Sequence, residues 1–266
     1  MTWLSNTVLG SGTSVPSRRL APAHLVRAPD AALLVDCGSG CTTSLFRAGV
    51  TLDRIDGVFL THLHPDHTAD LVPLLFALVN PVHPARTADL PIRGPEGVAA
   101  HLEALRAAYG RWVRPSTCEV RAEELAHHQR VDLGGLACTA FSVTHAGKPS
   151  FAYRFERGGR VLCLSGDSGP CDGLLEAARG AHLFICECAA LDGEELAGHM
   201  SPTQVGRLAR EAGCRRVVLT HLYDHVERAG PVALVRAVFD GEVELARDGQ
   251  EYAVGSWPSS SSSGIR

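Results

Sequence analysis

The stretch Thr61-His62-Leu63-His64-Pro65-Asp66-His67 follows an apolar run and carries four possible metal ligands within six residues. His62 and His64 are two residues apart, so on an extended segment both side chains point to the same side. Asp66 and His67 follow where the chain can turn into a helix, and they can face a second point in space. Imidazole and carboxylate ligands together suit zinc, with manganese and iron as alternatives. We therefore predict that this loop provides ligands to two neighbouring divalent metal ions.

The alternative is a polar loop that carries its histidines by accident. The chain has 13 histidines in 266 residues, and three of them lie in this loop beside an aspartate. Such clustering favours a metal site, although a motif match remains a hypothesis until its structural context is known.

Length and composition indicate an ordinary globular protein. The 266 residues suffice for a large core, and hydrophobic residues make up 45% and charged residues 20%. The formal net charge of −4 argues against a protein that coats nucleic acid, since such proteins usually carry a basic face. A small local basic patch is compatible with it. We predict a single domain over residues 1–258 and a disordered, serine-rich tail over residues 259–266.

Cysteine usage and hydropathy indicate a cytoplasmic protein. The nine cysteines are an odd number scattered through apolar segments, and we interpret them as reduced, buried thiols. The N-terminus lacks the charged region and the apolar core of a signal peptide. No apolar run reaches the length of a transmembrane helix, so we expect no membrane partner.

Possible ligands recur at the ends of predicted strands. Strands that end at the same edge of a sheet bring the residues after them together, whereas ligands scattered at random through loops have no reason to meet. Five apolar segments end in this way, at Asp36, His62, His145, Asp167 and His221.

Helices are predicted over Leu71–Val79 and over Gly97–Tyr109 from their apolar periodicity. A third begins after Ser201, which is placed as the N-cap with Gln204 in the capping-box position. Residues 113–136 give no clear pattern. The pair His127-His128 lies there beside acidic residues, and we interpret it as a charged surface in preference to a metal site.

The order of the motifs resembles that of the metallo-β-lactamase fold hydrolases. The H-x-H-x-D-H loop is followed by His145, by the Ser-Gly-Asp turn that ends at Asp167 and by the Leu-Thr-His sequence that ends at His221. The opening is similar to that of the ribonuclease Z branch of this superfamily, with matches at Leu9, Gly10, Gly12 and Pro16. The resemblance spans roughly residues 7 to 225.

The resemblance implies an α+β fold, a four-layer αβ/βα sandwich with two mixed β-sheets packed face to face and helices outside. It also implies a set of ligands for each of two metal ions. The first ion would be held by His62, His64 and His145, and the second by Asp66, His67 and His221. Asp167 would bridge both ions, and Asp36 would support the histidine loop from behind or, alternatively, serve only as a turn cap.

The chemistry implied is hydrolysis of a phosphodiester by a hydroxide that bridges the two metals. Asp66 would orient this nucleophile. His199 would give a proton to the leaving group, and Glu187 would orient His199, as in the H-x-[ST]-P motif of ribonuclease Z-like enzymes. The plainer alternatives are a helix-cap histidine and a surface-proximal glutamate.

The chain departs from ribonuclease Z between His145 and Asp167, where one short hairpin leaves no room for the long arm that clamps tRNA. This favours a small phosphodiester or nucleotide as substrate, with an RNA 3′ end also considered, and the family makes a homodimer possible. His225 is expected to line the cleft. Two alternatives stay open: hydrolysis of a carboxylic ester, thioester or lactam at the same site, and a non-hydrolytic metal-binding or redox protein. The position of His199 favours phosphodiesters.

Overall fold

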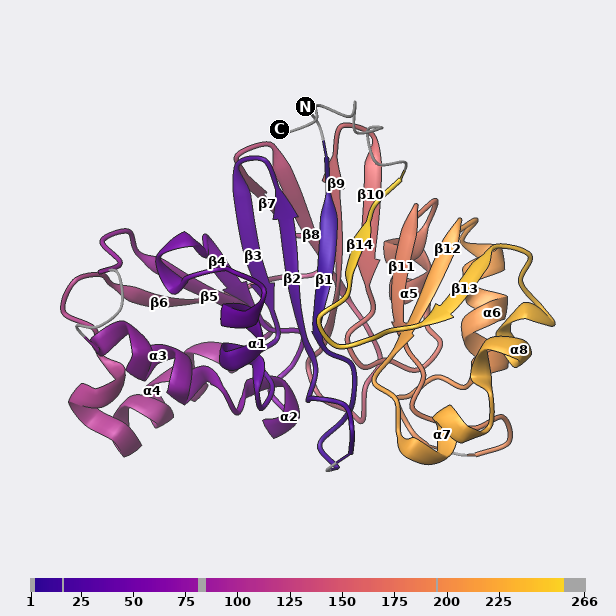
Figure 1. The fold of residues 1–266 in the computed structure, drawn as a ribbon, viewed down its shortest axis with the longest axis horizontal. Coiled ribbons are helices and arrows are strands. Elements are labelled where there is room, and N and C mark those ends of the chain that lie inside the picture. Colours follow the sequence, from indigo (N-terminus) through magenta and orange to yellow (C-terminus); the bar gives the residue numbers. More distant parts are fainter. Residues whose placement is uncertain (1–2, 16, 81–84, 195, 256–266) are drawn as a thin grey trace, which may run out of the picture.

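Two mixed β-sheets form the centre of the protein in the computed structural model, which describes residues 3–15, 17–80, 85–194 and 196–255 (Figure 1). Within these residues each sheet has seven strands. The first sheet has the order β14 (Glu251–Ala253), β1 (Ser5–Gly10), β2 (Ala23–Ala28), β3 (Ala31–Val35), β4 (Gly57–Phe59), β5 (Leu90–Gly94), β6 (Val120–Glu124). The second has the order β13 (Glu242–Leu245), β12 (Arg216–Thr220), β11 (Leu183–Glu187), β10 (Arg160–Leu164), β9 (Phe151–Arg157), β8 (Leu136–Ser142), β7 (Arg130–Leu133).

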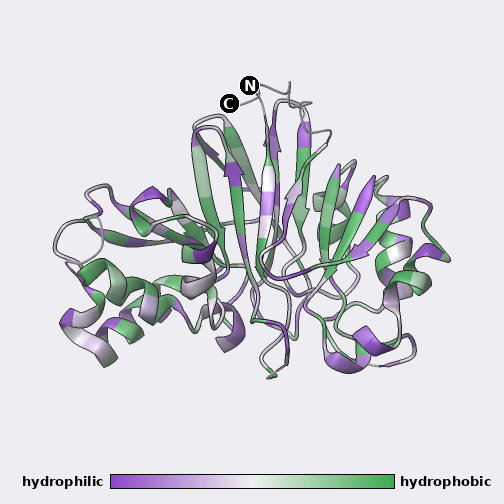
Figure 2. Ribbon diagram, viewed as in Figure 1, coloured by the Kyte–Doolittle hydropathy of each residue, from purple (hydrophilic) through white to green (hydrophobic). Residues whose placement is uncertain are grey.

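Helices cover the outer face of each sheet. The first sheet packs against α1 (Cys41–Arg47), α3 (Leu71–Val79) and α4 (Val98–Tyr109) through one apolar cluster. The second sheet packs against α5 (Asp172–Ala178), α6 (Pro202–Glu211) and α8 (Pro231–Arg236) through another. Short elements complete the described chain: η1 (Leu52–Arg54), α2 (Pro65–Thr68), η2 (Gly110–Val113) and α7 (Asp224–Arg228). Figure 2 shows hydrophobic residues along the strands of both sheets and hydrophilic residues on α7. The predicted four-layer αβ/βα sandwich is confirmed.

A third apolar cluster lies between the sheets and fixes their relative position. The Phe59 ring meets the Tyr153 ring edge-on, with 5.4 Å between centroids. The buried Tyr153 hydroxyl donates a 2.8 Å hydrogen bond to the carbonyl oxygen of Leu60. Since Leu60 directly precedes the histidine loop, this contact ties the loop's starting point to the opposite sheet.

The predicted elements are largely confirmed, with shifts at their ends. The helix over Leu71–Val79 has these bounds, and Ser201 and Gln204 form the predicted capping box at the start of α6. The apolar run before the histidine loop forms a strand only over Gly57–Phe59. The unassigned segment 113–136 contains β6 and β7, and β5, β13, β14 and α7 were also not predicted. Pro16 and the serine-rich tail over 259–266 lie outside the described residues, and the single domain over 1–258 stays a prediction.

All nine cysteines lie in the described residues, and all are free thiols. Seven of them are buried, as predicted. Among the helices of the described segments, none has the length and apolar character needed to span a bilayer.

Candidate metal centre

The histidine loop starts at Thr61 and is held from behind by Asp36, which directly follows β3. Asp36 accepts a 2.8 Å hydrogen bond from the Thr61 backbone N–H, a 2.9 Å bond from the Thr61 hydroxyl and a 2.7 Å bond from Nδ1 of His67. To do so Asp36 adopts φ 58°, a region that residues other than glycine seldom occupy. The predicted support of the loop by Asp36 is therefore confirmed as a set of contacts.

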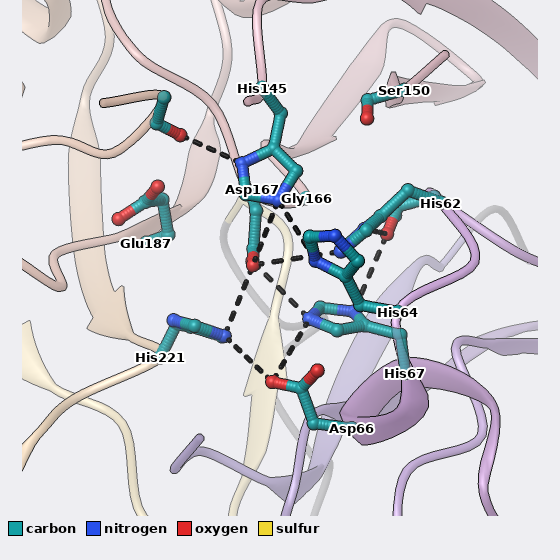
Figure 3. A network of polar contacts seen from close by, with 12 residues as sticks. His62, His64, Asp66, His67, His145, Ser150, Gly166, Asp167, Glu187 and His221 are labelled. Carbon is teal, nitrogen blue, oxygen red and sulfur yellow. Dashed lines mark hydrogen bonds and ion pairs between the residues drawn. The ribbon is translucent and has the colours of Figure 1, made fainter. Parts of the chain in front are cut away.

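One group of possible ligands combines the first half of the loop with two other segments. His62, His64, His145 and Asp167 present ligand atoms that all lie within 4.8 Å of one another (Figure 3). Nε2 of His145 lies 3.1 Å from Nδ1 of His64, and Nε2 of His62 lies 3.7 Å from a carboxylate oxygen of Asp167. These are the four residues predicted to surround the first metal ion.

A second group lies beside the first and shares Asp167 with it. Asp66, His67 and His221 also have ligand atoms within 4.8 Å of one another. The Asp167 carboxylate faces both groups. Its Oδ2 lies 3.7 Å from Nε2 of His62 in the first group and 3.2 Å from Nε2 of His221 in the second, and its Oδ1 lies 3.3 Å from Nε2 of His67. Asp167 thus lies where a bridging carboxylate would be needed.

The charges within the cluster suit a cation. Burial disfavours charge on Asp66, yet the nearby His221 ring, with Nε2 3.5 Å from a carboxylate oxygen, and the charge of His67 lower the pKa of this carboxyl to about 2. Burial and the nearby His67 lower the pKa of His62 to about 2. Burial also opposes ionisation of Asp167, but His221 and His67 outweigh it and hold its pKa well below the usual value. Ionised carboxylates and a neutral imidazole are the forms that bind a divalent metal.

Unpartnered polar atoms provide a direct test of whether the residues fit a metal. Among the described residues, Nε2 of His62, of His67 and of His221 are buried and have no hydrogen-bond partner. Buried polar atoms without a partner are rare and costly, so three at one point call for an unseen ligand. The opposite ring nitrogens are held in two of these histidines, because Nδ1 of His62 contacts the Thr61 hydroxyl and Nδ1 of His67 donates to Asp36. This arrangement is typical of metal-ligating histidines.

His145 is held in the same manner, although by a residue that the sequence did not indicate. Its Nδ1 donates a 2.9 Å hydrogen bond to the backbone carbonyl of Gly198. Gly198 has φ 80°, and a Cβ there would come within 2.5 Å of the Ala146 backbone nitrogen. A backbone carbonyl acceptor cannot be predicted from the types of side chain in a sequence. The one feature that marks this position is a glycine immediately before His199.

His199, which is partly buried, pairs with the buried Glu187 at the edge of the cluster. Nδ1 of His199 donates a 2.8 Å hydrogen bond to Oε1 of Glu187. Glu187 is fixed in turn by the backbone N–H groups of Ser168 and Ala189, each 3.0 Å from one of its oxygens. The His199 ring stacks on the His221 ring, with 5.7 Å between centroids. Burial opposes protonation of His199, but the bond to Glu187 and its charge raise the pKa of the imidazole above its usual value.

Gly38 is required by close packing under the loop. A Cβ at this position would lie 2.1 Å from the backbone oxygen of Asp66 and 2.7 Å from that of Pro22. Gly38→Ala is therefore expected to displace the loop and to weaken zinc binding by about 10–100-fold, the usual effect of disturbing residues that support a ligand. Competition against a chromophoric chelator measures this affinity.

Gly57→Ala is the matched control, because its nearest neighbour is the flexible end of the Arg93 side chain at 3.3 Å. Equal zinc affinity in both alanine variants would show that the close approach of Gly38 does not position Asp66.

The remaining candidates lie outside this cluster. His127, His128 and Glu176 are close enough together to hold an ion, but all three are exposed, in line with the charged surface expected there. His225 lines a surface hollow with Tyr223 and Glu194. The hairpin of β9 and β10 accounts for most of the chain between His145 and Asp167, so the arm expected to be missing is indeed absent from this part of the described chain.

Comparison with known proteins agrees with this geometry. A family model described as "Beta-lactamase superfamily domain" matches residues 32–222. A ribonuclease Z of Mycobacterium bovis is 31% identical over 92% of this chain and 96% of its own. The metallo-β-lactamase fold protein YhfI of Bacillus subtilis superimposes with a TM-score of 0.81, at 27% identity over 95% of this chain and 100% of that one. Human tRNase Z, short form, gives a TM-score of 0.74, at 25% identity over 95% and 100% of the two chains. The chain therefore belongs to the β-lactamase superfamily and, within it, is a short member of the ribonuclease Z-like group of metallo-β-lactamase fold proteins.

Proposed function

We propose that the protein is a metal-dependent phosphodiesterase with a dinuclear site. The observation that carries this proposal is the His199–Glu187 pair beside the clustered ligands. A site that only bound metal would need no adjoining imidazole whose pKa is raised by a carboxylate partner. An imidazolium in this position suits the protonation of a leaving alkoxide, which phosphodiester cleavage requires.

The ligands would divide between two ions as their positions suggest. The first ion would be held by His62, His64 and His145. The second would be held by Asp66, His67 and His221, with Asp167 between the two ions. Zinc suits this set of imidazoles and carboxylates best, with manganese or iron as alternatives. Two such ions would lower the pKa of water and stabilise negative charge on a phosphodiester.

The protein's own groups would then orient the reaction. The Asp66 carboxylate is ionised and partly exposed, so it can accept a hydrogen bond from an attacking water. His199 would hold a proton for the oxygen that leaves, and Glu187 would keep its ring fixed by accepting the bond from Nδ1. A carboxylate on one side and an imidazolium on the other give the site an acceptor and a donor for the two proton movements.

The substrate class follows from what surrounds the site. Relatives named ribonuclease Z support an RNA 3′ end. The short β9–β10 hairpin and the net charge of −4 favour a small phosphodiester or nucleotide instead. We place the small diester first. The free thiols support a cytoplasmic location.

The alternatives are separated by a panel of chromogenic substrates. Zinc- or manganese-loaded protein is expected to hydrolyse bis(p-nitrophenyl) phosphate faster than p-nitrophenyl acetate or a chromogenic cephalosporin, each relative to its uncatalysed rate. A reversed order would favour the carboxylic ester, thioester or lactam reading. No turnover of any of the three by protein that holds two metals would favour a non-hydrolytic metal-binding protein.

A further inference from the structure

An aromatic hollow lies next to the candidate metal centre. It has a volume of about 430 Å³ and is lined by Ala189, Glu194, Leu196, Tyr223 and His225. This volume is within the range of sites that bind small molecules. The hollow lies on the segments that follow β11 and β12, which also carry His199 and His221, and Glu187 is the last residue of β11.

Three of the lining residues directly adjoin groups of the site. The Tyr223 ring lies 6.4 Å from the His221 ring, centroid to centroid, and nearly perpendicular to it. The backbone N–H of Ala189 donates to the Glu187 carboxylate, and the backbone N–H of His199 donates to the Leu196 carbonyl. One small ligand could therefore place a phosphate at the cluster and a second group in the hollow.

The lining offers a surface for a flat ring. The Tyr223 and His225 rings lie 5.8 Å apart with planes inclined by 32°. The Thr13 side chain lies close to the Tyr223 hydroxyl. His225 lies beside Glu194, with 3.5 Å between Nε2 and Oε2, and Leu196 leaves 41% of its surface exposed. Two aromatic rings beside an exposed apolar side chain are suited to stack on a nucleobase, since every base has a π-face.

The neighbouring hollow on the Asp66 side differs in character. It is lined largely by hydroxyl-bearing and aliphatic side chains, with no aromatic ring, and includes Thr13, Ser14, Ser17 and Ser39. Its Arg19 guanidinium is already occupied by bonds to Glu227, to the Ser11 hydroxyl and to the Ala246 carbonyl. A flat heterocycle would gain stacking only in the hollow at Tyr223.

We propose that this hollow binds the nucleobase of the substrate through stacking on Tyr223 and His225, so that the substrate is a nucleotide-derived phosphodiester. This inference rests on the proposed function, because it places the base relative to a phosphate held at the metal centre. It predicts that a nucleoside monophosphate binds more tightly than the same sugar phosphate without its base.

The test is calorimetric titration of zinc-loaded protein with adenosine 5′-monophosphate and with ribose 5-phosphate. Both probes offer the same phosphate and sugar, so the ratio of their dissociation constants isolates the base. We expect the nucleotide to bind about tenfold more tightly, and we expect Tyr223→Leu to bring the ratio close to one. His225→Ala, which removes an exposed ring and so spares folding, is expected to reduce the ratio in the same direction.

Tyr109→Leu is the matched control, because Tyr109 is an exposed tyrosine at the end of α4 on the other sheet's helical layer. It should leave the ratio unchanged. A ratio of one in the unaltered protein, or a preference that survives both Tyr223→Leu and His225→Ala, would overturn the nucleobase site. A preserved preference for the nucleotide in protein that does not hydrolyse bis(p-nitrophenyl) phosphate would instead reject the proposed reaction and leave the base site standing.

Discussion

Asp167→Ala is expected to lower the zinc content from two ions per chain to at most one and to reduce phosphodiester hydrolysis by roughly a thousandfold. The Asp167 carboxylate lies between the two groups of histidines, 3.7 Å from Nε2 of His62 on one side and 3.2 Å from Nε2 of His221 on the other. Its loss removes the ligand that the two ions would share. A dinuclear site contributes several kcal/mol to the stabilisation of charge in the transition state. Each 1.36 kcal/mol lost lowers the rate about tenfold. Elemental analysis of dialysed protein and initial rates are the measurements.

Asp172→Ala is the control for this change, since Asp172 is an exposed aspartate in the first turn of α5, five residues further along the chain. It should retain both ions and full activity. Two tightly bound ions in Asp167→Ala would contradict the bridging position.

His199→Ala is expected to affect substrates according to how much their leaving group needs a proton. A dinucleotide leaves a sugar alkoxide, so its hydrolysis should fall by about 10²–10⁴-fold, the usual contribution of a positioned proton donor. A nucleoside p-nitrophenyl phosphate leaves an anion that is stable near neutral pH, and its hydrolysis should fall by no more than about tenfold. Steady-state rates with both diesters give the comparison.

Glu187→Gln should show the same dependence on the leaving group in weaker form, because it removes the acceptor that orients His199 without removing the ring. His127→Ala serves as control, since this exposed histidine lies outside the cluster. Equal losses on both diesters in His199→Ala would mean that His199 supports the structure and donates no proton.

The ligand set could be read from the sequence because the ligands occupy the ends of apolar runs. Val35, Leu164 and Thr220 end strands of buried residues, and the chain turns at the same edge of the sandwich after each of them. Strand register within a buried sheet is fixed by hydrophobic pattern, so the residues that follow are placed with it. The start of α6 was readable for a local reason, since the capping box involves only Ser201 and Gln204.

Other features depend on contacts between distant residues and left no local signal. The strand β14 has three residues and exists through its pairing with β1, so that Tyr252 lies opposite Asn6. The strand β7 has only four residues, which alternate between exposed polar and half-buried apolar side chains, and so short a run is ambiguous in the sequence. Tertiary context decides such edge strands more than propensity does.

Contacts around the site that use backbone atoms could likewise not be predicted from the sequence. The carbonyl of Gly198 that accepts from His145 is one case, and the positive φ of His221, 54°, is another. Such backbone strain persists only where the surrounding structure enforces it, and functional sites are where it concentrates. Sequence reasoning could name His221 as a ligand but could not foresee the strained backbone that aims it.

Titration of metal-free protein with zinc, while hydrolysis of bis(p-nitrophenyl) phosphate is followed, tests whether the clustered ligands form a dinuclear hydrolytic site. We expect no turnover without metal and a rate that rises until two equivalents of zinc are bound, and we expect Asp66→Ala to lose this turnover. Protein that binds two equivalents and still hydrolyses the diester no faster than the buffer would contradict it.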